Sequence, residues 1–184
     1  MMSQKAKVKL VFLVHEGSAQ TNLKAVEKAI TDGVIDAQIL CIVSDKDSLP
    51  DFNKISPDYI CLAGWKKIIP DKLVTDYKIL NMHPGLIPES LDGKVENPDG
   101  TEALWNKGMY ADKAIGNFLN KKSTYAGSTL HFLTSDFDFG PVLGRTFEKV
   151  LAGDTVETLY TRLKKKENEL YVEALSKLTK NDKR

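Results

Sequence analysis

KILNMHPGLIP, at residues 78–88, sets the architecture of this chain. This short apolar run contains an amide, that of Asn81, and an imidazole, that of His83. Pro84 then ends the strand because proline cannot donate a hydrogen bond to the neighbouring strand. Side chains alternate along a strand, so Asn81 and His83 lie on the same face. Open α/β sheets bind ligands beyond the carboxyl ends of their strands. This stretch therefore predicts a strand end that carries functional side chains.

Apolar runs alternate with helical patterns on both sides of this strand. Further strands are predicted at Val8–Val14, Ala37–Val43, Asp58–Ala63, Tyr125–Thr134 and Val142–Val150, and helices at Leu23–Ile30, Pro70–Val74, Thr101–Gly108, Ala111–Leu119 and Thr155–Leu178. Nearly continuous apolar strands separated by helices are typical of parallel sheets. We therefore predict an α/β fold, an open, mostly parallel twisted sheet with helices on both faces. The last two strands, around a turn at 135–141, are expected to form an antiparallel edge pair.

Length and composition limit the class of protein. With 184 residues, a single domain over 1–184 is expected, and 26 Lys and Arg against 25 Asp and Glu argue against nucleic-acid and membrane partners. Cys41 and Cys61 lie in apolar runs without metal-ligand spacing, so we expect buried, reduced thiols. No apolar run approaches the ~18 residues of a membrane span, and the opening segment does not read as a signal peptide. The expected location is the cytoplasm.

The three histidines differ in their sequence context. Two interpretations of His83 remain open on pattern alone: a satisfied core histidine, or a functional group at the strand end beside Pro84 and two residues after Asn81. His131 lies in the middle of a predicted strand, which favours a structural or supporting role. His15 follows the first strand, where a loop histidine at the surface is the default.

Three further features carry two interpretations each. Asp136 and Asp138 read as turn aspartates that satisfy backbone N–H groups, unless the fold brings them to His83. The loop Gly17–Asn22 precedes the first helix, whose N–H groups attract anions, although many such loops bind nothing. Glu167 interrupts an apolar stripe on the last helix. It is either solvated at the end of that stripe or buried against a partner such as a substrate.

Taken together, these residues resemble the folate-dependent formyltransferases. Asn81-x-His83-Pro84 with Leu86-Ile87-Pro88 is similar to the family's Asn-x-His-Pro-Ser-Leu-Leu-Pro signature. Gly127 to Phe132, followed by Asp138-Phe139-Gly140-Pro141, is similar to its Gly-x-x-x-His-Phe…Asp-x-Gly-Pro segment. Cys61 to Trp65 resembles the strand before its folate pocket, and the resemblance covers most of the chain. The fold that it implies is the Rossmann-like formyltransferase fold.

The resemblance also implies a reaction and roles. Formyl transfer from 10-formyltetrahydrofolate to an amine is expected, with glycinamide ribonucleotide as acceptor, small molecules as the only partners and no metal. The implied catalytic residues are Asn81, His83 and Asp138, supported by His131; the implied substrate-binding residues are Gly17, Ser18, Thr21, Asn22 and Glu167; and the implied folate-binding residues are Trp65, Lys66, Lys67, Ile68, Ile69, Ser135 and Asp136. A monomer or homodimer is expected.

The chain departs from the family pattern in several places. The loop before the first helix is longer and poorer in glycine than the family's phosphate loop. Gly85 replaces a common Ser, and Lys67 a common Arg. Between Val43 and Asp58 the chain lacks a helix–strand–helix block of the family, whereas the region after Pro88 is longer. Two alternatives therefore stay open: a formyltransferase for another amine, such as an amino-sugar nucleotide, and a folate- or nucleotide-binding relic.

Overall fold

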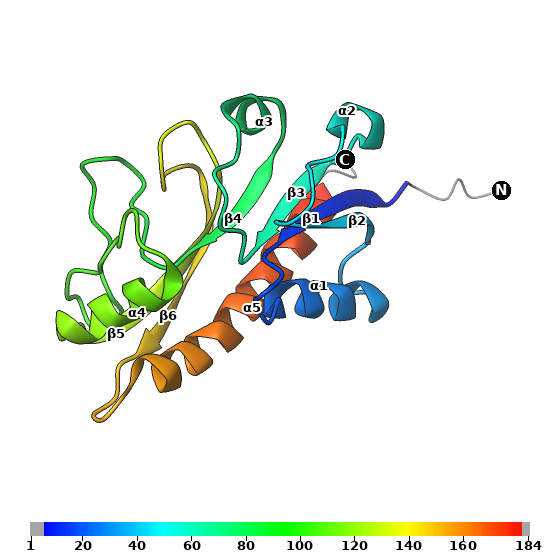
Figure 1. Ribbon diagram of the computed structural model, residues 1–184. Coiled ribbons are helices and arrows are strands. Elements are labelled where there is room, and N and C mark those ends of the chain that lie inside the picture. Colours follow the sequence, from blue (N-terminus) through cyan, green and yellow to red (C-terminus); the bar gives the residue numbers. More distant parts are fainter. Residues whose placement is uncertain (1–5, 182–184) are drawn as a thin grey trace. The chain divides into compact units, whose positions relative to one another are not determined.

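The computed structural model describes residues 6–181 of the chain, drawn in Figure 1. Along the chain the elements are β1 (Val8–Val14), α1 (Thr21–Thr31), β2 (Ala37–Ser44), α2 (Phe52–Ile55), β3 (Tyr59–Ala63), α3 (Asp71–Asp76), β4 (Ile79–His83), α4 (Ala111–Asn120), β5 (Tyr125–Phe132), β6 (Val142–Lys149) and α5 (Val156–Asn181). The strands form one six-stranded sheet in the order β2-β1-β3-β4-β5-β6. Strands β1 to β4 pair in parallel, and β5 pairs with β6 antiparallel. The predicted open, mostly parallel sheet with an antiparallel edge pair is confirmed.

The chain divides into two compact units. Unit 1 comprises residues 1–80 and 171–184, and unit 2 comprises residues 81–170. Both boundaries fall inside regular elements, β4 and α5. The expectation of a single domain over 1–184 stays a prediction. Within residues 6–181, every helix is too short or too polar to cross a membrane.

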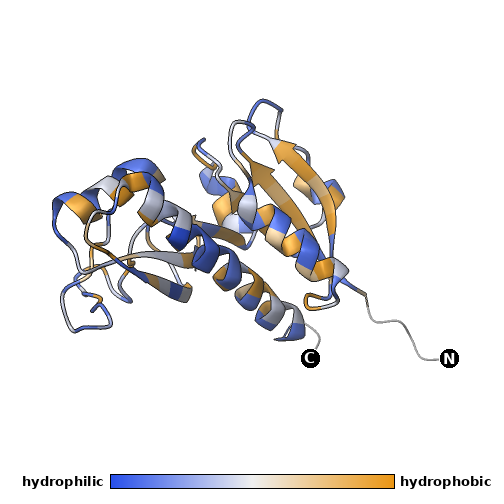
Figure 2. Cartoon of the chain, turned by 90° about the horizontal axis from the view of Figure 1, so that it is seen from below, coloured by the Kyte–Doolittle hydropathy of each residue, from blue (hydrophilic) through white to orange (hydrophobic). Residues whose placement is uncertain are grey.

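Unit 1 is built on three parallel strands. Nearly all side chains of β1 and β3 are buried, and Figure 2 colours the strands of this unit mostly orange, which marks hydrophobic residues. In Figure 1, α1 lies on one side of these strands, and α2 and α3 on the other. Helix α1 buries Leu23, Val26 and Ala29, the spacing of a single apolar face. Strand β2 is at the edge of the sheet and only partly buried, so Cys41 is partly exposed, contrary to the prediction, whereas Cys61 is buried.

Unit 2 has a core of its own. Six buried side chains pack together: Leu86, Ile115, Phe118, Ala126, Leu159 and Leu163. They come from the segment after β4, from α4, from β5 and from the first half of α5. Because side chains of each element are buried here, this core fixes β5 against α4 and α5. The carboxyl-terminal residues of β4 and the whole of β5 therefore belong to one packed body.

The predicted helix over Thr101–Gly108 is wrong. Its backbone makes a bridge between Glu96 and Glu102 and then turns twice, at Asn106 with φ 56° and at Gly108 with φ 78°. A residue in the left-handed region ends a right-handed helix. The amide of Leu86 instead donates to the carbonyl of Leu104 at 2.9 Å. This segment is therefore tied to the residues that follow β4.

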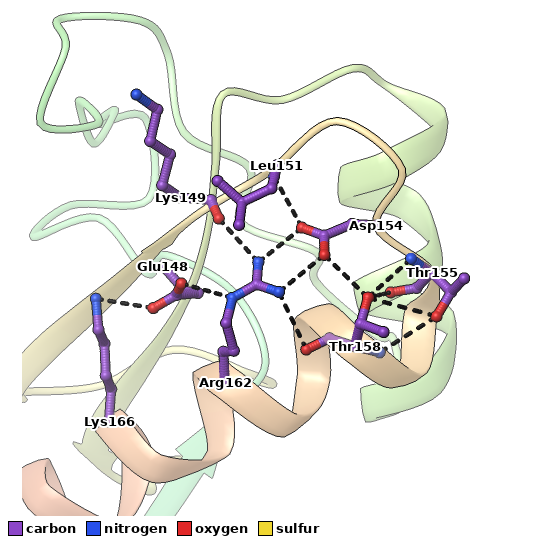
Figure 3. A network of polar contacts seen from close by, with 8 residues as sticks. All are labelled: Glu148, Lys149, Leu151, Asp154, Thr155, Thr158, Arg162 and Lys166. Carbon is purple, nitrogen blue, oxygen red and sulfur yellow. Dashed lines mark hydrogen bonds and ion pairs between the residues drawn. The ribbon is translucent and has the colours of Figure 1, made fainter.

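Two smaller differences concern a short additional helix and the start of the last helix. The polar stretch 44–57 contains one helical turn, α2, capped by the Asp51 side chain. Helix α5 begins one residue later than expected, and its cap pairs Thr155 with Thr158. The Thr158 amide donates to Thr155 Oγ1 at 3.2 Å, and the Thr155 amide donates to Thr158 Oγ1 at 3.0 Å. Figure 3 shows these reciprocal bonds.

Candidate active site

The end of β4 brings its two polar residues into unit 2. His83 is 1% exposed and Asn81 partly buried. Two further predicted residues reach them from elsewhere in the unit: His131 from β5, and Asp138 from the turn between β5 and β6. The His83 and His131 rings meet edge to face, with centroids 6.4 Å apart. Asn81, His83, His131 and Asp138 therefore gather at one place, as the sequence resemblance implied.

His131 fixes the amide of Asn81. Its Nδ1 lies 3.0 Å from the carbonyl oxygen of Phe132, so the ring proton resides on Nδ1. Its Nε2 then accepts from Nδ2 of Asn81 at 3.2 Å. Burial and the neighbouring His83 lower the pKa of His131 to about 4, which keeps this ring neutral at neutral pH. One Nδ2 proton of Asn81 is used in this way, and its second proton is not part of that bond.

His83 lies between a carbonyl and a carboxylate. Its Nε2 donates to the backbone oxygen of Trp105 at 2.7 Å, and its Nδ1 faces Oδ1 of Asp138 at 3.7 Å, beyond hydrogen-bond distance. Burial lowers the pKa of His83, and Asp138 and the Trp105 carbonyl raise it by less. The Asp138 carboxylate favours the charged ring, but desolvation outweighs it, so the His83 ring is neutral at neutral pH.

Asp138 is held in place by its turn. Its backbone has φ 49°, in the left-handed region that aspartate tolerates better than most residues. Oδ2 accepts from the Gly108 amide at 2.6 Å, and the backbone oxygen accepts from Trp105 Nε1 at 3.0 Å. With Oδ2 engaged, Oδ1 is left facing His83. Asp136, two residues earlier, is exposed like Ser135, so the two turn aspartates differ in their surroundings.

Glu167 is buried rather than solvated. It is 2% exposed, its Oε1 accepts from Ser128 Oγ at 2.6 Å, and its Oε2 accepts from Lys164 Nζ at 2.8 Å. The interpretation that this carboxylate lies in water is therefore wrong. A partner within the protein, rather than a ligand, compensates its burial in this structure.

The predicted phosphate loop lies in unit 1. Helix α1 begins at Thr21 after Gln20, which has φ 51° and forms no side-chain cap. Asn22 is 3% exposed, and Thr21 Oγ1 and Asn22 Oδ1 are buried without a hydrogen-bond partner among the described residues. Gly17 is exposed and Ser18 Oγ donates to the His15 carbonyl at 2.9 Å. His15 itself is paired with Asp45.

The predicted folate residues fall into both units. In unit 1, Lys66 and Lys67 are exposed, Ile68 is 91% exposed, and Ile69 is buried. Trp65 Nε1 is a buried donor without a hydrogen-bond partner among residues 6–181. In unit 2, Ser135 and Asp136 are exposed at the turn after β5.

Sequence reasoning missed Trp105 and Gly108, which contact His83 and Asp138. A backbone carbonyl and a backbone amide leave no mark in a sequence. One signal was present nevertheless: Asn106-Lys107-Gly108 contains two residue types that favour the left-handed region and argue against a helix. Gly85 stands where the family has a Ser, and the sequence alone does not explain this departure. The structure explains it, because the Trp105 carbonyl lies where a side chain at position 85 would begin.

Comparison with known proteins places the chain in a family. The family described as "Formyl transferase" matches residues 50–175. The chain is 33% identical over 135 residues to "Phosphoribosylglycinamide formyltransferase, chloroplastic" of Arabidopsis thaliana, covering 72% of this chain and 41% of that protein. It is 30% identical over 171 residues to "Trifunctional purine biosynthetic protein adenosine-3" of Bos taurus, covering 90% of this chain and 15% of that protein. It thus spans less than half the length of these two relatives.

A solved structure shares the fold. Glycinamide ribonucleotide transformylase 1 from Symbiobacterium toebii superimposes with a TM-score of 0.79 at 23% identity, covering 98% of this chain and 92% of that chain. The family match spans more than half of the chain and includes both residues at the end of β4 and the turn that carries Asp138. On these grounds the chain belongs to the formyl transferase family.

Proposed function

We propose that this protein transfers a formyl group from 10-formyltetrahydrofolate to the amine of glycinamide ribonucleotide, a step of purine biosynthesis carried out in the cytoplasm. The observation that carries the proposal is the group formed by Asn81, His83 and Asp138 within unit 2. Asn81 Nδ2 carries a second proton besides the one bonded to His131, and Nδ1 of His83 lies 3.7 Å from the Asp138 carboxylate, beyond hydrogen-bond distance. The names of the relatives support glycinamide ribonucleotide as the acceptor.

The three residues suit the charge changes of the reaction. The amine nitrogen forms a bond to the formyl carbon, and the carbonyl electron pair moves onto the formyl oxygen. Asn81 donates its free N–H to this oxygen, where a preorganised donor is worth ~2.7–4 kcal/mol of barrier. His83, once protonated, adds a charge-assisted hydrogen bond. Asp138 stabilises the imidazolium or accepts the amine's proton through a water.

The collapse of the intermediate completes the balance. The electron pair on oxygen re-forms the carbonyl, and the bond between the formyl carbon and the folate nitrogen breaks. The amine loses one proton, and the folate nitrogen takes one up. His83 and Asp138 carry this proton from the amine to the folate nitrogen. The unliganded His83 is neutral, so it can accept the amine's proton before it donates one.

The loop of unit 1 supports a phosphorylated acceptor. The first turn of α1 lacks a side-chain cap, and no acidic side chain occupies it. Its free N–H groups and the positive end of the helix dipole favour an anion. Thr21 and Asn22 add buried polar groups that lack partners in this structure. We propose that Gly17, Ser18, Thr21 and Asn22 bind the phosphate.

Further contacts are proposed for Glu167 and for the folate. Glu167 is proposed to contact the acceptor, which requires it to share a carboxylate oxygen now bonded to Ser128 or Lys164. Trp65 to Ile69, Ser135 and Asp136 are proposed to bind the folate, with the unpaired indole N–H of Trp65 as one donor. We propose small molecules as the only partners of a monomer or homodimer.

A formyl-transfer assay with both substrates tests the catalytic group. His83→Ala and Asp138→Asn are each expected to lower kcat by at least about 10²–10³-fold, the loss typical of one preorganised donor. Folding and the binding of a stable folate analogue are expected to remain. Asp92→Asn, an exposed aspartate of the loop after β4, is the matched control and is expected to behave as wild type. Wild-type turnover in either active-site variant would overturn the roles proposed here.

A thermal-shift experiment tests the acceptor. Glycinamide ribonucleotide, an amino-sugar nucleotide and a stable folate analogue are each added at saturating concentration, because a ligand that binds only the folded state raises Tm. A rise with the folate analogue and with glycinamide ribonucleotide alone supports the proposal. A rise with the amino-sugar nucleotide instead assigns another amine, and binding without turnover identifies a relic.

A further inference from the structure

The segment 104–108, here called the bridging segment, spans both ionisable groups of the proposed catalytic trio. The Trp105 carbonyl accepts from His83 Nε2 at 2.7 Å, and the Gly108 amide donates to Asp138 Oδ2 at 2.6 Å. The Trp105 indole donates to the Asp138 carbonyl at 3.0 Å. One short stretch of chain thus holds the histidine by one bond and the aspartate by two.

The bridging segment is anchored independently of these contacts. The Leu86 amide donates to the Leu104 carbonyl at 2.9 Å, and the Asn106 side chain donates to the Pro84 carbonyl at 3.1 Å. Asn106 also accepts from Asn117 of α4 at 2.8 Å. Asn106 is 6% exposed, and its φ of 56° turns the chain beside Trp105. The Trp105 carbonyl is therefore fixed from both sides.

Gly85 leaves the space that this carbonyl occupies. A Cβ on Gly85 would lie 1.9 Å from the Trp105 oxygen, 2.6 Å from the Trp105 carbonyl carbon and 3.0 Å from His83 Nε2. Its backbone is not among those with positive φ, so space rather than conformation requires glycine here. Any larger residue must displace the carbonyl from His83.

The two facing histidines have opposite tautomers as a result. The Phe132 carbonyl places the proton of His131 on Nδ1, whereas the Trp105 carbonyl places the proton of His83 on Nε2. The neutral His83 ring then has one lone pair, on Nδ1, which faces Asp138 Oδ1 at 3.7 Å. The ionisable groups around His83 are Asp138 and His131, with Lys107 above the Trp105 ring.

We propose that the backbone carbonyl of Trp105 is a positioning group that ties down Nε2 of His83 and makes Nδ1, beside Asp138, the nitrogen that exchanges the proton in formyl transfer. The assignment of the tautomer stands on hydrogen bonds alone, and the assignment of the reacting nitrogen rests on the proposed function. The bridging segment thereby links the loop after β4 to His83, the last residue of β4.

Nitrogen-15 NMR of the whole protein with labelled histidine tests the tautomer. The chain has three histidines, so His15→Gln and His131→Gln variants assign the signals. At pH 7.5, His83 is expected to show a pyrrole-like Nε2 and a pyridine-like Nδ1, and His131 the reverse pattern in the same spectrum. A pyridine-like Nε2 on His83 overturns the proposal, whether or not the protein transfers formyl groups.

Gly85→Ala tests the reacting nitrogen. The methyl group displaces the Trp105 carbonyl, so both tautomers of His83 become populated and its NMR signals shift. The expected kinetic result is a fall in kcat of roughly 10- to 100-fold, as for a small misplacement of a catalytic group, with KM changed little. The acidic limb of the pH profile of kcat is expected to move as well. Gly116→Ala in α4, where a Cβ meets only Val156 at 3.8 Å, is the matched control.

Trp105→Phe separates the carbonyl from the indole. This variant keeps the backbone oxygen and removes only the bond from Nε1 to Asp138, so the tautomer of His83 is expected to stay unchanged. It also serves if Gly85→Ala fails to fold. An unchanged pH profile in a folded Gly85→Ala protein overturns the proposal, as does a switched tautomer in Trp105→Phe. Absence of turnover in the wild type with the predicted tautomer rejects the proposed function and leaves the tautomer assignment intact.

Discussion

Glu167 and Lys164 form an ion pair one helical turn apart in α5, with very unequal exposure. The side chain of Glu167 is 3% exposed and that of Lys164 is 27% exposed, with 2.8 Å between Oε2 and Nζ. A carboxylate so buried needs every available partner, and Ser128 provides the other hydrogen bond. The charge is therefore maintained by its neighbours on β5 and α5.

Glu167→Gln tests this balance at a single residue. The amide keeps a hydrogen bond to Ser128 but loses the ion pair and turns a donor toward the Lys164 ammonium. We expect a loss of about 1–3 kcal/mol in the free energy of unfolding. Urea denaturation gives the midpoint, with the exposed Glu169→Gln on the same helix as control. Equal midpoints for both variants would show that the pair contributes nothing.

The sequence allowed the prediction that Asn81, His83 and Asp138 lie together, and the structure places them so. Asn81 and His83 stand out because Pro84 ends their strand, whereas Asp138 was singled out only by the family resemblance. Trp105 was missed because its contribution comes from a backbone oxygen. Glu167 was identified as unusual, but only the fold shows that Ser128 and Lys164 reach it.

At the scale of elements, the start of α5 carries a network of polar contacts, which Figure 3 shows. Arg162 donates to Asp154 and to Glu148, and Asp154 accepts from the Leu151 amide at 2.8 Å. The Arg162 side chain, through its hydrogen bond, lowers the pKa of Asp154 well below its usual value. The network joins the end of β6 to the first turns of α5.

Thr155→Ala tests the cap of this helix. The substitution removes the acceptor for the Thr158 amide while Asp154 remains, so we expect a loss of ~1 kcal/mol, the usual cost of a lost cap. Chemical denaturation measures it against Thr161→Ala, an exposed position without a capping role. If the two variants were equally stable, the Thr155 hydroxyl would contribute nothing to the stability of this helix end.

At the scale of the whole molecule, the strand order follows from patterns that the sequence displays clearly. Continuous apolar runs such as Val8–Val14 mark the parallel strands, and the turn 135–141 marks the antiparallel pair. The division into two units is not visible in the sequence, because its boundaries lie inside β4 and α5 rather than in linkers. The edge position of β2 could not be predicted from the sequence either, because its amino-acid composition matches that of a buried strand.

The buried histidines predict how stability depends on pH. The pKa of His131 is lowered to about 4 from 6.5, and that of His83 is lowered as well, so between these values the unfolded chain binds more protons than the folded one. Stability is therefore expected to fall as pH drops from 6.5 to 4, by about 3 kcal/mol from His131 alone. Carboxyl groups with lowered pKa, such as Asp154, act only below their usual 3.8.

Denaturation at several pH values measures this slope. The slope of the unfolding free energy against pH reports how many more protons the unfolded chain binds. Between pH 6.5 and 4 this number is expected to be smaller in His131→Gln by up to one proton, even if the variant is less stable at every pH. A slope unchanged by the substitution would mean that His131 titrates alike in both states. In the folded protein the Asn81 amide is expected to lose its acceptor only near pH 4, because a protonated His131 cannot accept from it.

The distribution of the proposed functions between the two units has an evolutionary consequence. Every group that handles protons, together with the bridging segment, lies within residues 81–170, whereas the loop proposed to hold the acceptor's phosphate lies within residues 1–80. Mutations in that loop leave the hydrogen bonds of His83 and Asp138 untouched. The chemistry and the binding of the acceptor's phosphate can therefore diversify separately, and the proposed phosphate loop is itself a place where this chain departs from the family pattern.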